Sequence, residues 1–144
     1  MLGVFSAIEI SASGLSAQRT RMNTIASNLA NAQTTRTEAG GPYQRVDPVF
    51  EAVALDKIRA LTPSERSVSM VAVTRIAKDP RPGPEVYSPG HPDANADGYV
   101  QYPNVNIVEE MVNMITASRA YEAGVTSLKA TQQMADSALG LGRK

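Results

Sequence analysis

The sequence predicts an α+β fold, in which long N- and C-terminal helices form a coiled-coil stem with a small β-rich insert between them. All nine prolines lie between Pro42 and Pro103, and because proline breaks helices, long helices are expected only outside that stretch. On either side of it, apolar residues recur at alternating spacings of three and four, which is typical of helices packed lengthwise. The 144 residues therefore divide into an N-terminal helix (1–36), an insert (37–103) and a C-terminal helix (104–144).

The first helix is expected from Ser6 to Gln33, with a length of about 40 Å. Ser6 and Glu9 have the S-x-x-E spacing of a capping box, which would start the helix at Ser6. Gly14 costs about 1 kcal/mol relative to alanine inside a helix, which indicates that a neighbour approaches closely there. The apolar seam consists of Phe5, Ile8, Ala12, Leu15, Met22, Ala26 and Leu29, with Arg19 interrupting it.

The insert is expected to form a single small, twisted sheet. Residues 43–53 predict an edge strand, because Pro48 lacks an amide donor. Residues 68–76 alternate in the manner of a strand. The segments 86–87 and 99–100 are expected to pair, residues 79–84 to form a stiff proline-rich turn, and residues 61–66 to form an exposed connection.

The last helix is expected from Asn106 to Leu139, with a length of about 50 Å. Asn106 and Glu109 have capping-box spacing, and Glu109 and Glu110 suit the positive end of the helix dipole. Gly140 and Gly142 are expected to stop the helix. Its seam consists of Ile107, Met111, Met114, Ser118, Tyr121, Val125, Leu128, Ala135 and Leu139, with Gln132 interrupting it.

The composition excludes several classes of protein. A formal net charge of zero predicts no general attraction to nucleic acid or to anionic lipid. The absence of cysteine excludes disulfides and thiolate metal sites. No stretch approaches the roughly 20 apolar residues that cross a bilayer, and no cleavable secretory signal is visible. We therefore expect neither a nucleic-acid partner nor membrane insertion.

The loop from His91 to Gly98 has the strongest likeness to a chemical site. Asp93, Asn95, Asp97 and Gly98 match the opening of a calcium loop, but Asn104 stands where a bidentate glutamate is needed. The pattern favours a structural turn, with weak calcium binding as the alternative. The chain has a single histidine and no G-x-S-x-G motif, so we expect no catalytic residue, no metal and no cofactor.

Three asparagines, Asn23, Asn28 and Asn31, lie near the end of the first predicted helix, although asparagine is a poor interior helix former. One interpretation is a frayed helix end with Asn31 near the cap. The other is hydrogen bonding across a helix interface, because Asn28 is adjacent to Leu29 in the seam. The sequence leaves both open.

Two distant stretches resemble a known family. Residues 13–34 include Gly14-Leu15, Arg21-Met22 and Asn28-Leu29-Ala30-Asn31, and residues 87–111 read YSPGHPDANADGYVQYPNVNIVEEM. With the closing segment 118–143, they resemble the bacterial flagellar rod and hook axial proteins, and residues 87–111 are similar to the proximal rod members in particular. Residues 37–86 resemble the family only in length and general character.

The resemblance implies a structural subunit of the basal-body rod, a hollow shaft that transmits torque. It implies export through the flagellar type III apparatus without a cleaved signal, and assembly in the periplasm with copies of itself and other rod proteins. It also implies that the terminal helices pair and line the inner tube, while the middle segment forms an outer domain.

We expect the seams to be completed when copies stack, since a contact between two different surfaces that does not close produces a helical filament. The alternatives are a cytoplasmic helical adaptor and, less in keeping with the motifs, a small metal-dependent enzyme using the loop from His91 to Asp97. Residues 87–111 argue against a sibling rod protein. The expected assembly residues are Leu15, Met22, Ile25, Asn28, Leu29, Asn31, Met111, Met114, Ile115, Tyr121, Val125 and Leu128.

Overall fold

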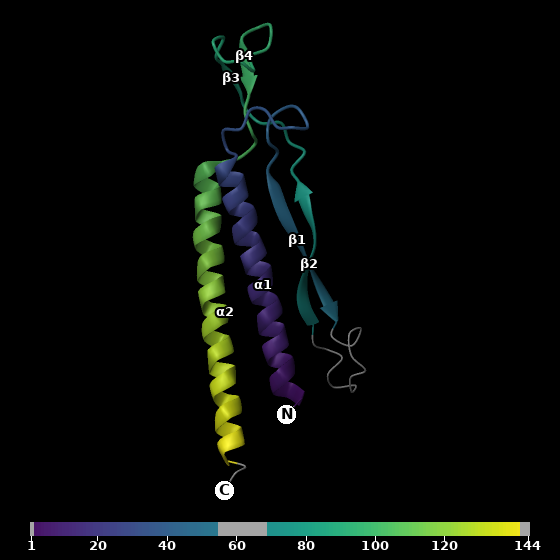
Figure 1. Ribbon diagram of the computed structural model, residues 1–144, viewed down its shortest axis with the longest axis vertical. Helices are drawn as coiled ribbons and strands as arrows, with labels where there is room; N and C mark the ends of the chain where they lie inside the picture. Colours follow the sequence, from purple (N-terminus) through teal and green to yellow (C-terminus); the bar gives the residue numbers. More distant parts are fainter. Residues whose placement is uncertain (1, 55–68, 142–144) are drawn as a thin grey trace.

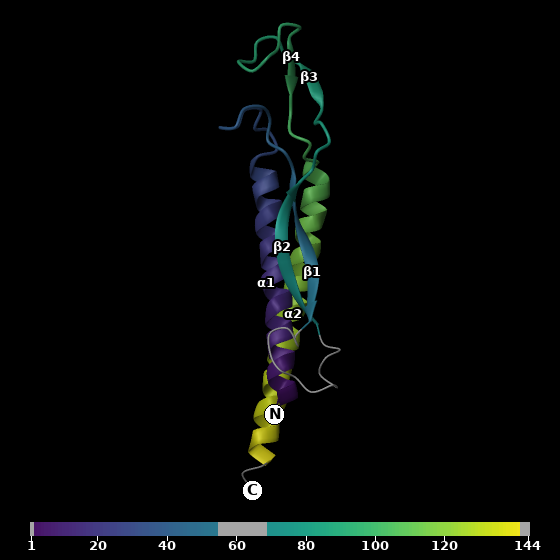
Figure 2. The same ribbon diagram turned by 90° about the vertical axis from the view of Figure 1, so that its right-hand side faces the viewer.

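The computed structural model describes residues 2–54 and 69–141 and has the predicted α+β architecture. It forms an elongated slab of three layers, in which α1 lies between α2 on one side and a hairpin of β1 and β2 on the other (Figure 1, Figure 2). A second hairpin, β3 and β4, extends beyond the stem (Figure 1). The elements are α1 (Leu2–Ala30), β1 (Val46–Ala54), β2 (Ser69–Lys78), β3 (Glu85–Tyr87), β4 (Tyr99–Gln101) and α2 (Ile107–Leu141).

Helix α1 begins at Leu2, so the predicted start at Ser6 is wrong. The partner helix α2 has 35 residues against 29 in α1, and Phe5 and Ile8 lie beside Ala135 and Leu139 near its far end. Packing against this longer partner stabilises a first turn that local capping signals do not predict. The helix ends at Ala30, before the expected Gln33, and a turn follows.

Strands β1 and β2 pair antiparallel, from Val46 opposite Lys78 to Ala54 opposite Ser69, with an irregularity between Val49 and Phe50. Their hairpin packs along α1, where the Val71 amide donates to Ser13 Oγ at 3.3 Å. The expected single sheet is wrong, because β3 and β4 form a separate one. Three prolines between the hairpins remove the amide donors that a continuous ladder needs.

The β3–β4 hairpin confirms the predicted pairing of residues 86–87 with 99–100. Its loop is a structural turn, as predicted: Gly98 has a φ of 81°, and Asn95 Oδ1 accepts from the amides of Asp97 at 3.0 Å and Tyr99 at 2.8 Å. The Tyr87 and Tyr99 rings meet edge to face, with centroids 5.3 Å apart. The connection expected at residues 61–66 lies outside the described residues.

Helix α2 begins as predicted, because Asn106 Oδ1 accepts from the amides of Val108 at 3.1 Å and Glu109 at 3.3 Å. The predicted stop at Gly140 is wrong, since the helix continues to Leu141. One glycine costs about 1 kcal/mol in a helix and does not by itself end it.

The core of this slab is thin and built from small residues. A Cβ at Gly124 would lie 2.9 Å from Leu15 Cδ2, so the two helices approach closely at that point. Among the described residues, the largest fully buried side chains are Glu110, Val100 and Asn28. Two of these three are polar, and both lie where the stem meets the insert.

Candidate assembly surface and buried junction

A cluster of polar side chains, here called the junction, joins α1, β1 and α2. Asn28, in the last turn of α1, is fully buried. Its Nδ2 donates to the Val46 carbonyl at 2.9 Å and to Glu110 Oε2 at 3.0 Å. Its Oδ1 accepts from the Val46 amide and from the Tyr43 hydroxyl, both at 3.0 Å. One side chain therefore links three segments that are far apart in the sequence.

Glu110 is the charged centre of the junction and is 1% exposed. Its Oε1 accepts from Arg45 Nε at 2.8 Å, and Arg45 also pairs with Asp47 at 3.1 Å. Partial burial lowers the pKa of Arg45, but its hydrogen bonds to Glu110 and Asp47 outweigh this effect and raise the pKa overall. Arg45 therefore stays protonated and neutralises the buried carboxylate.

The sequence predicted that Glu110 interacts with the positive end of the helix dipole. It gave no signal that Arg45 pairs with Glu110. Asn28 makes the contacts expected from the second interpretation, hydrogen bonding across an interface. Asn31 fits the first, because its Nδ2 donates to the Ser27 carbonyl at 2.9 Å and its Oδ1 accepts from Thr34 Oγ1 at 3.2 Å. Each interpretation thus describes one residue.

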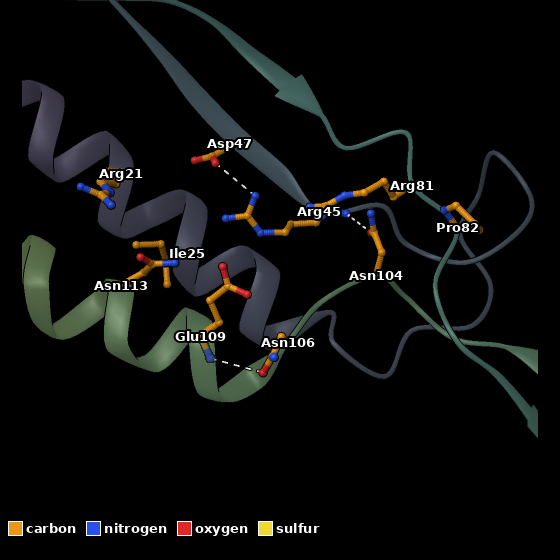
Figure 3. A pocket seen from close by; sticks show the side chains of 10 residues that line it. All are labelled: Arg21, Ile25, Arg45, Asp47, Arg81, Pro82, Asn104, Asn106, Glu109 and Asn113. Carbon is orange, nitrogen blue, oxygen red and sulfur yellow. Dashed lines mark hydrogen bonds and ion pairs between the residues drawn. The ribbon is translucent and has the colours of Figure 1, made fainter.

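A polar cavity of about 500 Å³ lies beside the junction (Figure 3). The charges around it are largely neutralised within the chain, since Arg45 pairs with Glu110 and Asp47, and Arg81 with Asp79. Asn104 Oδ1 accepts from the Arg45 amide at 2.7 Å. These pairings indicate that the cavity is structural and lies where the insert joins the stem. Its lining consists of Arg21, Ile25, Arg45, Asp47, Arg81, Pro82, Asn104, Asn106, Glu109 and Asn113.

The expected assembly residues fall into three groups by burial. Ile25 and Asn28 are buried within the chain, whereas Met111 and Ile115 are exposed. Because α1 and α2 pack against each other, part of each seam is already covered in one copy. A role in assembly stays a prediction for all of them. The remaining eight, which are half-buried, are Leu15, Met22, Leu29, Asn31, Met114, Tyr121, Val125 and Leu128.

An exposed apolar face, here called the α2 strip, covers the first turns of α2. Its five residues are between 46% and 71% exposed. They follow helical spacing, on the side of α2 away from the buried Glu110 and Ala117. Contiguous exposed apolar surface of this kind marks an interaction site. The strip consists of Ile107, Val108, Met111, Val112 and Ile115.

Comparison with known proteins identifies the family. The family described as "Flagella basal body rod protein" matches residues 8–36, and the family described as "Flagellar basal body rod FlgEFG protein C-terminal" matches residues 96–141. The flagellar basal-body rod protein FlgC of Aquifex aeolicus is 43% identical over 93% of each chain. FlgC of Borreliella burgdorferi is 40% identical, over 97% of this chain and 98% of the relative.

The chain belongs to the FlgC family of flagellar basal-body rod proteins. FlgC of Bacillus subtilis is likewise 40% identical, over 96% of this chain and 98% of its own. The chain is therefore a structural subunit of the rod, and the enzyme alternative is wrong. The resemblance noted at residues 13–34 and 87–111 is confirmed.

The loop from His91 to Gly98, which resembles the opening of a calcium site, makes structural contacts in this FlgC family member. Asp93 accepts from Thr35 Oγ1 at 2.8 Å and pairs with Arg36 at 3.4 Å. His91 Nδ1 accepts from the Asp93 amide at 3.1 Å. Within residues 2–54 and 69–141, no three acidic or histidine side chains gather as a metal site would need. In the same residues, no helix is long and apolar enough to cross a membrane.

Proposed function

We propose that this chain is a subunit of the proximal rod, where it assembles helically with copies of itself and with other rod proteins into a hollow shaft that transmits torque. The observation that carries the proposal is the identity of 37–43% with proteins named FlgC over nearly the whole chain. We further propose that residues 1–36 and 104–144 form the axial stem and residues 37–103 the outer part. The packing of α1 against α2 supports this division.

The exposed surface of the chain suits such a role. A thin core and a strip of large apolar residues leave apolar area that a neighbouring subunit would bury. Met111 and Ile115, two of the expected assembly residues, lie in the α2 strip. Their outward position supports a contact between subunits, whereas Ile25 and Asn28 would act by shaping the stem.

The export route belongs to the same proposal. We infer that the flagellar type III apparatus carries the chain to the periplasm without cleaving a signal. In a strain with an inactive export apparatus, the chain should stay in the cytoplasm. In the parent strain, peptide mapping of isolated basal bodies should recover peptides that begin at Met1 or Leu2. Recovery of a chain lacking its first 20 or so residues would contradict this route, since a cleaved signal has about that length.

Gene deletion with complementation tests the main proposal. Deletion should abolish motility and leave basal bodies without a complete rod, and the wild-type chain should restore both. Mass spectrometry of the complemented basal bodies should detect the chain. Motility without the chain, or basal bodies that lack it, would contradict the proposal.

A further inference from the structure

The β1–β2 hairpin carries a second set of exposed apolar side chains. The β1–β2 hairpin and α2 lie on opposite sides of α1 (Figure 1, Figure 2). In the hairpin, Phe50 pairs with Val73, Ala52 with Val71, and Pro48 with Ile76, so these side chains share one face. The exposed members of this hairpin face are Phe50, Ala52, Val71 and Ile76.

The two faces match in character and in length. Phe50, Val71 and Ile76 on the hairpin face are 39–55% exposed, and the residues of the α2 strip 46–71%. On the same hairpin face, Val73 is half-buried and Pro48 is buried. From Ile107 to Ile115 the strip spans eight helical steps, or about 12 Å. From Val71 to Ile76 the hairpin face spans five strand steps, or about 16 Å. The chain carries no net charge, so no overall repulsion opposes contact between copies.

We propose that the α2 strip of one copy packs against the hairpin face of the next copy, with both copies pointing the same way. This inference rests on the proposed function and specifies one contact within the rod. Because the two faces differ, the contact is heterologous, and every added copy leaves one face of each kind open. Such a contact extends an array and does not close a dimer.

The junction gives a common level along the stem, from which the shift between neighbouring copies follows. Asn28 bonds both Val46 and Glu110, so the start of β1 and the first turn of α2 lie at one level. Ile107 lies three helical residues before Glu110, about 4.5 Å toward the tip. Ile76 pairs with Pro48, about 7 Å below Val46 in the opposite direction (Figure 1). Aligning the faces therefore shifts each neighbour by roughly 12 Å along the stem, which favours a helical array over a flat ring.

Cysteine cross-linking can test this register, because the chain has no cysteine of its own. Two double variants, Ile107→Cys with Ile76→Cys and Ile115→Cys with Val71→Cys, place thiols at matching ends of the two faces. After mild oxidation of basal bodies from motile cells, each should give a ladder of dimers, trimers and larger species. The crossed pair, Ile107→Cys with Val71→Cys, uses the same faces at mismatched ends and should give none.

Exposed positions away from both faces provide a second control. Ala120→Cys with Glu51→Cys places thiols at exposed positions outside both faces and should not cross-link. Dimers from any single variant would mean that like faces meet, and a ladder from the crossed pair would mean that copies are antiparallel. Either result overturns the inference, as does linkage only to other rod proteins. An absence of cross-links in both matched pairs, with the chain present in basal bodies, overturns the inference and leaves the proposed function intact.

Discussion

At the scale of single residues, the most consequential feature is a buried carboxylate at the junction of stem and insert. Taking Glu110 out of water costs free energy unless its charge is compensated. Arg45 supplies the charge and Asn28 a further hydrogen bond, so both carboxylate oxygens have partners. The same three residues hold α1, the start of β1 and α2 together, so they link the stem to the insert.

Glu110→Ala should lower the free energy of unfolding by about 2–3 kcal/mol, because Arg45 Nε and one Nδ2 hydrogen of Asn28 lose their buried acceptor. Arg45 keeps its pairing with Asp47, and Asn28 keeps its bond to the Val46 carbonyl. Glu109→Ala, at the exposed neighbouring position, should change it by less than about 0.5 kcal/mol. Urea unfolding followed by circular dichroism measures both values. Equal losses in the two variants would mean that the junction carries no special share of stability.

A second residue-scale prediction concerns Asp79. The side chain and backbone amide of Arg81 donate to it, and these hydrogen bonds lower the pKa of Asp79 from 3.8 to about 2. Since this pKa is lower in the folded chain, the pair stabilises folding above about pH 4 and loses that effect as the pH falls toward 2. In Arg81→Ala, the titration midpoint of the Asp79 carboxyl, followed by carbon NMR, should rise toward 3.8. An unchanged midpoint would contradict the assigned cause.

At the scale of elements, the two chain segments that join the stem to the β3–β4 hairpin make close contact at Gly83. A Cβ there would lie 1.9 Å from the Tyr102 carbonyl oxygen, whereas one at Gly90 would meet nothing within 4 Å. Gly83→Ala should therefore force the segments apart and destabilise the fold by about 1–3 kcal/mol, while Gly90→Ala should be close to neutral. Hydrogen exchange of the Tyr102 amide, which donates to the Pro84 carbonyl at 2.9 Å, measures the local effect. Equal protection of the Tyr102 amide in both variants would rule out this close contact.

The two sides of α2 should respond differently to charge. Leu128, half-buried on the side of α2 that carries the buried Ala117, should destabilise the stem when replaced by aspartate, because a charge would then be partly removed from water. Val108→Asp, at the most exposed position of the α2 strip, should leave the free energy of unfolding nearly unchanged but sharply reduce incorporation into basal bodies. Ala120→Asp, at an exposed position of α2 outside the strip, serves as the matched surface control. Normal incorporation of the Val108 variant would argue against the strip as an interface.

The sequence predicted the elements better than their contacts. Helical periodicity and the confinement of proline located both helices, and alternation located the strands to within a few residues. The start at Leu2 depends on packing between α1 and α2, which local signals do not contain. The helix continues past Gly140 because the cost of one glycine is too small to end it. The junction was not predicted because Glu110 meets residues that are 65 and 82 positions away, and no spacing rule connects them.

The assembly residues show the same limit. A seam at 3.5-residue spacing identifies the apolar side of a helix, but it does not say whether that side faces the partner helix or a neighbouring copy. The fold separates the two cases: Ile25 is covered within the chain, and Met111 is open. Val108 and Val112, which are not among the expected assembly residues, are exposed like Met111.

At the scale of the whole molecule, the chain is a slab without a thick interior. Long helices side by side bury mainly small residues such as Ala17 and Ala117. Large apolar side chains remain on both outer layers, the α2 strip and the hairpin face, so the free chain retains apolar surface that association would remove from water. Assembly would therefore complete the burial of apolar surface that a single copy leaves unfinished.

Maleimide labelling of Met111→Cys tests most directly whether neighbouring subunits cover the α2 strip in the rod. Labelling should be fast in the purified chain and at least about ten-fold slower in intact basal bodies, while Ala120→Cys, on another side of α2, should be less protected. Equal labelling rates for Met111→Cys in the two states would contradict the account.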